Sequence, residues 1–434
     1  MAEDHALALC EHAPQHPQHV KSKSMAPALI AVRPDGACVV VAVGAHLRIF
    51  DFSTGCAVDI KDNTNPTLHG DAIRSIAFNV EGSLFATVGD DKRVKLWDAK
   101  TWTCIKTICL TKKVSAVTFS NDSLWFMVAD KFGIVYVFST SPSDPAGEPV
   151  QLLAHCCSII TCMICSPDCK YIVTSDRDFK IRVTGFPEEP LAGAHEIHSY
   201  CLGHTNFVAC LAFVGSYGLL VSGGGDCTVR LWHYESGTLL DTFDTTKGDE
   251  SDLKEDSRAV VALASSPPST VAAILERFEG VLIFSCDPLE KKLKLLKKVV
   301  TPGYCPSSLS FDCNNNLWMV AGAAECVVKG DEFVTPEAEA AAQTQAQGIA
   351  LAAVTHVQVA REGTLLDAAE IPGGDSLLRT LQGSEADVTK VQSATEAAEL
   401  AMKDLLSKRQ YTAEQRENRK RMRNDKKVAT ITAD

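Results

Sequence analysis

The sequence predicts an all-β fold, a seven-bladed β-propeller followed by a basic tail that is helical or disordered. Two observations predict the propeller. Histidine and aspartate recur at a fixed spacing beside short apolar strands, and four equivalent aspartates lie 39, 48 and 48 residues apart. A period of this length is typical of a four-stranded propeller blade.

Three of the repeats share a histidine, a hydroxyl residue, an aspartate and a final position that is aromatic in two of them. The aspartate follows the histidine by 22, 23 and 22 residues, with the hydroxyl residue four before it and the final position six after it. The members are His69, Thr87, Asp91 and Trp97; His155, Thr174, Asp178 and Thr184; His204, Ser222, Asp226 and Trp232. A weaker copy places Asp130 and Tyr136 at the same interval.

Such a set can form a hydrogen-bonded network inside each blade, because histidine and aspartate can fix a turn while the hydroxyl group accepts the tryptophan N–H. A catalytic dyad is the alternative. Three copies at one spacing indicate a structural network rather than one active site. The chain contains no Walker loop, GxSxG or HExxH motif, so we assign no catalytic residue, cofactor or metal site.

The pattern resembles the WD40 repeat, on Gly203-His204, Trp97-Asp98 and the D-x-x-V-x-L-W runs at Asp91 and Asp226. Seven blades are expected, at Ala28–Ile60, His69–Ile108, Val114–Leu153, His155–Leu202, His204–Phe243, Arg258–Val300 and Tyr304–Val328. The last blade is short of strands. Val354–Val359 or the N-terminal strand is expected to pair with it and close the ring.

The domain organisation follows from these boundaries. We expect an N-terminal segment (1–24), the propeller (25–360), a linker (361–392) and a basic helical or disordered tail (393–434). Within the propeller, 245–257 reads as a polar loop and 336–348 as a low-complexity insert.

Charge is unevenly distributed along the 434 residues. The net charge is −12, whereas Lys408–Lys427 contains nine basic and three acidic residues and carries +6, which leaves −18 on the rest. No apolar run is long enough to cross a bilayer, and no secretory signal is expected, so no membrane partner is expected. The 17 cysteines show no disulfide framework, and we expect buried thiols in a reducing compartment.

The fourth blade departs from its relatives. Its stretch TSDRDFKIRVT (Thr174–Thr184) ends in threonine and carries Arg177, Lys180 and Arg182. The missing tryptophan predicts an accessible flank beside this positive charge. A structural alternative for Arg182 is a strand residue whose aliphatic stem packs between blades.

Several segments resemble one WD40 family, the non-catalytic subunit of the eukaryotic tRNA guanine-N7 methyltransferase. They are Ser166–Thr184, His195–Phe213, Leu219–Phe243 and the tail Lys408–Lys427. The resemblance implies a scaffold that docks, stabilises and activates a Rossmann-type catalytic subunit in a heterodimer. That partner would bind S-adenosylmethionine and methylate position 46 in the tRNA variable loop. The resemblance also implies that Arg182 pairs with an acidic residue of the partner, with Arg177 and Lys180 assisting.

The tail has three readings: a bipartite nuclear localisation signal, a contact to tRNA phosphates, or a solvated frayed helix. We expect a nuclear protein. The residues concerned are Lys408, Arg409, Arg419, Lys420, Arg421, Arg423, Lys426 and Lys427. An alternative for the whole chain is a generic WD40 adaptor, such as a ubiquitin-ligase substrate receptor or a chromatin-binding module, which should show an aromatic-lined central pocket.

Overall fold

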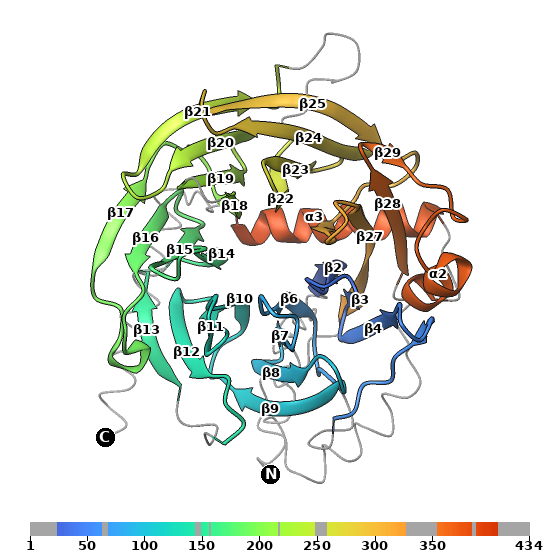
Figure 1. Cartoon of the computed structure of the whole chain (residues 1–434), viewed down its shortest axis with the longest axis horizontal. Coiled ribbons are helices and arrows are strands. Elements are labelled where there is room, and N and C mark those ends of the chain that lie inside the picture. Colours follow the sequence, from blue (N-terminus) through green and yellow to red (C-terminus); the bar gives the residue numbers. More distant parts are fainter. Residues whose placement is uncertain are drawn as a thin grey trace, which may run out of the picture.

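Seven antiparallel sheets are arranged radially around a central axis (Figure 1), which confirms the predicted propeller. The structure is a computed structural model and describes residues 24–62, 68–143, 149–155, 158–215, 218–247, 258–326, 354–383 and 388–406. The predicted low-complexity insert and all the basic tail residues lie outside this range, as do residues 1–23 and most of the loop 245–257.

Blades 1 to 6 are four-stranded meanders, numbered from the inner strand outward. Blades 1 to 3 comprise β2 (Leu29–Val32), β3 (Cys38–Val43), β4 (His46–Asp51), β5 (Cys56–Ala57); β6 (Ile73–Phe78), β7 (Leu84–Gly89), β8 (Arg93–Asp98), β9 (Thr103–Cys109); β10 (Val114–Phe119), β11 (Trp125–Asp130), β12 (Ile134–Ser139), β13 (Val150–Ala154). Blades 4 to 6 comprise β14 (Ile160–Cys165), β15 (Tyr171–Asp176), β16 (Ile181–Gly185), β17 (Ile197–Cys201); β18 (Val208–Val214), β19 (Leu219–Gly224), β20 (Thr228–His233), β21 (Thr238–Asp244); β22 (Val260–Ser266), β23 (Thr270–Leu275), β24 (Gly280–Asp287), β25 (Lys292–Val300).

Blade 7 is assembled from distant parts of the chain. It contains β26 (Ser308–Phe311), β27 (Leu317–Cys326), β28 (Val354–Arg361) and β29 (Thr364–Leu365). The N-terminal strand β1 (Ser24–Pro27) pairs with the far end of β27, beyond its pairing with β26. Both expected closing segments therefore join the same sheet, one on each side of β27.

Two helices follow the propeller strands. The helix α2 (Gly374–Gln382) lies in the range expected to be a linker, and it packs Leu377 and Leu381 into the core of blades 1 and 7. Arg48 Nη1 donates to Leu381 O at 2.9 Å, which ties the helix to β4. The described residues 361–383 therefore form part of the propeller, because the leucines of α2 cover a sheet face.

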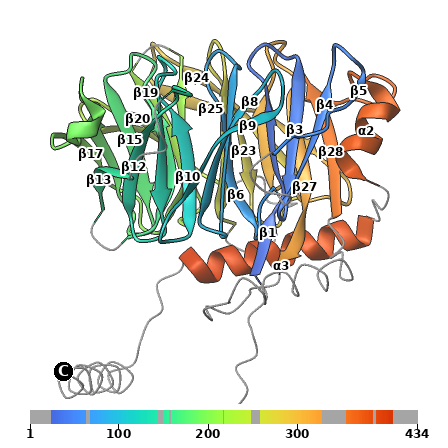
Figure 2. The same ribbon diagram turned by 90° about the horizontal axis from the view of Figure 1, so that it is seen from below.

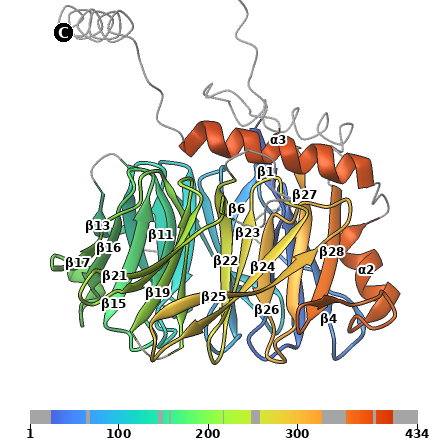
Figure 3. The same cartoon turned by 90° about the horizontal axis from the view of Figure 1, so that it is seen from above.

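The helix α3 (Val388–Leu406) lies across one end of the propeller, beside β1 and β27 (Figures 2 and 3). It begins before the boundary expected at residue 393. Its buried face includes Val391, Ala398 and Leu406, whereas Leu400 is exposed. None of the described helices is long and apolar enough to cross a membrane.

The core consists of apolar side chains that interdigitate between neighbouring blades. Trp97, Trp232 and Trp318 are among the largest fully buried side chains. The thirteen cysteines whose side chains the structure describes are free, and most of them are buried or half-buried. Among the described residues, a short 3-10 turn, η1 (Pro190–Ala192), lies between β16 and β17.

Candidate partner-binding surface on blade 4

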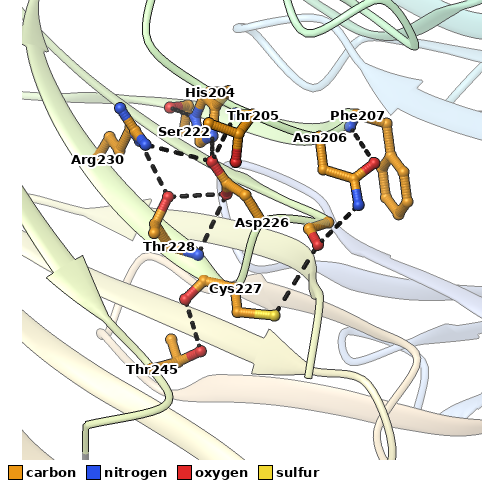
Figure 4. Close-up of polar contacts among 12 residues, drawn as sticks. His204, Thr205, Asn206, Phe207, Ser222, Asp226, Cys227, Thr228, Arg230 and Thr245 are labelled. Carbon is orange, nitrogen blue, oxygen red and sulfur yellow. Dashed lines mark hydrogen bonds and ion pairs between the residues drawn. The ribbon is translucent and has the colours of Figure 1, made fainter. Parts of the chain in front are cut away.

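The predicted hydrogen-bonded network is present in blades 2 and 5, and Figure 4 shows the second of these. In blade 5, His204 Nδ1 lies 2.8 Å from Asp226 Oδ2, and its Nε2 lies 2.7 Å from Ser222 Oγ. Trp232 Nε1 donates to the same hydroxyl at 2.8 Å. Blade 2 repeats the arrangement with His69, Asp91, Thr87 and Trp97. The network links three strands and leaves none of these buried polar groups unpaired.

Electrostatics in the network favour an ionised aspartate. Burial by itself would raise the pKa of Asp226, but hydrogen bonds from His204 and Thr228 hold it at about 2. The backbone amides of Thr205 and Thr228 also donate to this carboxylate, at 3.1 and 3.3 Å. Every oxygen and ring nitrogen is used inside the blade, so the network offers no free group for catalysis.

Blade 4 uses a different aspartate from the one expected. His155 Nδ1 lies 3.0 Å from Asp176 Oδ2, and its Nε2 lies 2.8 Å from Thr174 Oγ1. Asp176 Oδ1 also accepts from the backbone amides of Asp178 and Lys180. The prediction that Asp178 is the histidine's partner is therefore wrong, although His155 and Thr174 take their expected places.

The residue at the end of the second strand explains this exchange. Blades 2 and 5 have Gly89 and Gly224 there, and a Cβ atom would lie 2.6 Å from Ala72 O and 2.2 Å from Phe207 O. Blade 4 carries Asp176 at that position, and its carboxylate reaches the histidine directly. Blade 3 likewise has Asp130 there, which accepts from the amides of Phe132 and Ile134. A glycine or aspartate two residues after the hydroxyl position is the signal that distinguishes the two arrangements.

Arg182 contacts the threonine that stands in place of the tryptophan. Its Nε donates to Thr184 Oγ1 at 3.0 Å, and its Nη1 donates to Ala154 O at 2.9 Å. Thr184 is fully buried, so the expectation of an accessible flank at this residue is wrong. The guanidinium is half-buried, and burial lowers its pKa, yet an arginine keeps its charge at neutral pH.

The charge of Arg182 is not neutralised within the described chain, since no carboxylate there lies within 4.0 Å of it. Its equivalent in blade 5, Arg230, contacts Asp226 at 3.3 Å. Lys95 in blade 2 is fully buried and ion-paired with Asp62. A fixed arginine without an acidic neighbour therefore distinguishes blade 4 from both.

Arg177 and Lys180 lie in the turn between β15 and β16, close to Arg182 in sequence. Arg177 is half-buried, with its Nε 3.9 Å from Asp178 Oδ1. The backbone amide of Arg177 donates to Ile159 O, which fixes the turn, and Lys180 is exposed.

Two exposed residues, one in β17 and one just after it, border these charges. They were not identified from the sequence. Tyr200 pairs with Arg182 across the sheet and is 41% exposed. Leu202, 60% exposed, follows Cys201, which pairs with Ile181, so it lies opposite Lys180. We call Arg177, Lys180, Arg182, Tyr200 and Leu202 the blade-4 surface. Large apolar groups around a fixed charge are typical of a protein interface.

The central cavity of the propeller does not fit the peptide-reading alternative. It has a volume of about 250 Å3 and is lined mainly by aliphatic and charged residues, with Phe207 as its one aromatic residue. Residues of α3 form part of its wall, including Glu399 and Met402. Within the described ranges no three His, Cys, Asp or Glu side chains lie close enough together to hold a metal ion.

Comparisons with known proteins decide the family. A family model described as the tRNA methyltransferase TRM82 WD40 domain matches residues 143–344, and a WD domain, G-beta repeat model matches residues 64–98. The "tRNA (guanine-N(7)-)-methyltransferase non-catalytic subunit WDR4" of Bos taurus is 31% identical over 336 residues, covering 75% of each chain. The chain belongs to this family of non-catalytic subunits. Its blade-4 surface lies within the stretch that the TRM82 model matches.

Further similarities agree with this assignment. The wdr4 non-catalytic subunit of Danio rerio is 37% identical over 254 residues, and the match covers 58% of this chain and 60% of that relative's length. Among solved structures, "Structure of U3-55K" aligns with a TM-score of 0.56 at 19% identity and covers 68% of this chain and 88% of the other. The structural likeness concerns the propeller fold alone. The family membership makes this protein a non-catalytic subunit and disfavours the generic adaptor.

Proposed function

We propose that this non-catalytic subunit docks and activates the catalytic subunit of a tRNA guanine-N7 methyltransferase through its blade-4 surface. The partner is proposed to be a Rossmann-type enzyme that binds S-adenosylmethionine and methylates position 46 of the tRNA variable loop within a heterodimer. The relatives' names support a catalytic partner. The proposal assigns no cofactor to the propeller itself.

The observation that carries the proposal is the state of Arg182. Its guanidinium is fixed by Thr184 and Ala154, is half-buried, and has no carboxylate within 4.0 Å among the described residues. Holding a charge in this way is unfavourable unless a partner supplies the opposite charge. A preorganised arginine loses little conformational entropy when it binds a carboxylate with two parallel hydrogen bonds. The expected ligand is therefore an aspartate or glutamate of the methyltransferase.

The test is the Arg182→Leu variant, co-expressed with the catalytic subunit. Removing one member of a desolvated interfacial ion pair costs about 2–5 kcal/mol, so co-purification should fall sharply. Arg379→Leu is the matched control, because Arg379 is exposed on α2 and distant in sequence from blade 4. Unchanged co-purification of a folded Arg182→Leu protein would contradict the proposal, as would an equal loss in the control.

Activity measurements separate this function from an enzyme or an adaptor. Purified propeller with S-adenosylmethionine and tRNA should transfer no methyl group, and the assembled complex should transfer it. Methyl transfer by the propeller alone would refute the scaffold role.

The proposal extends to cellular location. The basic cluster Lys408–Lys427 has the composition of a nuclear localisation signal, and we propose that it directs nuclear import. A fluorescent fusion in which Lys420, Arg421 and Arg423 become alanine should lose nuclear accumulation. Retention in the nucleus by a fusion that lacks the whole cluster would contradict this role.

A further inference from the structure

The outermost strand of blade 6 concentrates positive charge. Strand β25 forms the outer edge of its sheet (Figure 1), and its lysines together with the preceding turn residue we call the lysine strip. The strip comprises Lys291, Lys292, Lys294, Lys297 and Lys298. Four of the five are exposed, Lys298 is half-buried, and the exposed Leu296 lies among them. The region 291–300 contains no acidic residue.

None of the five lysines forms an ion pair in the described parts of the chain, since no carboxylate there lies within 4.0 Å of an ammonium group. Asp287 lies opposite Lys292 in the sheet, and Asp241 accepts from the backbone amide of Leu293. The one side-chain hydrogen bond in the strip runs from Lys297 Nζ to Thr364 Oγ1 at 3.1 Å. The strip is therefore a patch of five unpaired positive charges on a chain whose net charge is −12.

Protection of the sheet edge does not account for the strip. Lysines on an edge strand prevent pairing with other chains. The outermost strands of the other blades achieve this without them: β13, β17 and β21 contain no lysine, and β9 contains only Lys106. Lys106 is buried and donates to Ser139 O, so it presents no charge at that edge. Four lysines on one strand, with a fifth in the turn before it, require a different explanation.

The spacing of the strip suits an extended polyanion. At roughly 3.4 Å per residue, the seven steps from Lys291 to Lys298 span about 24 Å along the propeller rim. Lysine binds phosphate as a point charge without demanding one geometry, so a row of lysines can follow a nucleic-acid backbone.

The helix α3 ends on the inner side of the ring. Its last residue, Leu406, packs with Phe207 and Ala259, which precede the inner strands of blades 5 and 6. The lysine strip lies at the outer edge of blade 6, so α3 leaves it uncovered.

We propose that the lysine strip binds the phosphate backbone of RNA, and that in the assembled methyltransferase it holds the tRNA substrate. The second part rests on the function proposed above. The partner on blade 4 and the RNA on blade 6 use separate surfaces. The propeller thereby links the enzyme to its substrate without contributing a catalytic group.

The test compares the complex of wild-type chain and catalytic subunit with a variant in which all five lysines are alanine. Binding of unmodified tRNA is measured by fluorescence anisotropy at several salt concentrations. Each lost phosphate contact makes the slope of log K against log salt shallower by about 0.7–0.9. With three or more contacts, the slope should fall by about 2 or more and affinity near 0.1 M salt by at least about tenfold. The all-arginine version of the strip should keep wild-type binding.

A control variant and a measurement on the isolated chain distinguish the possible outcomes. Changing Lys61, Lys100 and Lys112 to alanine, which are exposed and scattered over other blades, should leave the slope nearly unchanged. The isolated chain with tRNA should show the same dependence on the strip, so failure to assemble with a methyltransferase would refute the proposed function and not this inference. An unchanged slope in both settings would overturn it. The inference would also be overturned if the all-alanine variant lost binding to anionic lipid vesicles but still bound tRNA like the wild type.

Discussion

Replacing Glu399 by glutamine should make the docking of α3 insensitive to pH. Glu399 is 8% exposed and lies near Glu276, which is 4% exposed. Lys403 pairs with Glu276 at 3.5 Å. Burial, with a smaller contribution from the charge of Glu276, raises the pKa of Glu399 from its ordinary 4.5 to about 7, although Arg277 opposes the shift.

The magnitude follows from proton linkage. An acid whose pKa is higher in the docked state binds a proton more readily there, so docking is strongest below pH 4.5 and weakens as the pH rises toward 7. A difference of about 2.5 pH units corresponds to about 3 kcal/mol of docking free energy. Glutamine stays neutral, so the variant should keep the low-pH docking free energy at pH 8.

Hydrogen–deuterium exchange of the α3 backbone amides measures this effect when rates are divided by their intrinsic values at each pH. Wild-type protection should fall by up to about a hundredfold between pH 5 and pH 8, and Glu399→Gln should remove most of that fall. Glu396→Gln is the control, since it removes the same charge from an exposed site on the same helix. Equal loss of protection in wild type and Glu399→Gln would refute the reasoning.

Two further predictions concern the blade networks. Ser222→Ala should lower the free energy of unfolding by about 2 kcal/mol, because it leaves His204 Nε2 and Trp232 Nε1 unpaired in the core. Urea unfolding measures this against exposed Ser236→Ala, and equal values for the two would contradict it. In blade 4, Asp176→Ala should lower the free energy of unfolding by about 2–3 kcal/mol, because Asp176 bonds to His155 and accepts from two turn amides. Asp178→Ala should lower it clearly less. Thermal unfolding of the pair checks the order, and a larger loss for Asp178→Ala would overturn the assignment.

The propeller and most of its networks could be predicted from the sequence because each blade repeats the same local solution. His204, Ser222, Asp226 and Trp232 make the same contacts as their blade-2 equivalents, so spacing alone locates them. The prediction that Asp178 pairs with His155 was wrong because a fixed spacing from the histidine does not show that Asp176 occupies the position of a glycine.

The contacts between distant segments could not be predicted in the same way. Thr184 is buried and accepts a hydrogen bond from Arg182, which the loss of the tryptophan does not predict. The helix α2 is bound by Arg48, more than 300 residues earlier in the chain. The lysines of β25 are visible in the sequence, but the absence of a described carboxylate within 4.0 Å of their ammonium groups emerges only when the blades are placed around the ring.

The pairing of β1 with β27 has a consequence for biosynthesis. Ser24 lies opposite Cys326, so a ribosome must add 302 residues before the N-terminal strand meets its neighbour. At roughly 5–20 residues per second, this takes about 15–60 seconds. Blade 4 is fully translated well before then, so a nascent chain contains Arg182 while its terminal sheets still have open edges. A prematurely terminated chain would contain the same arginine without a closed ring.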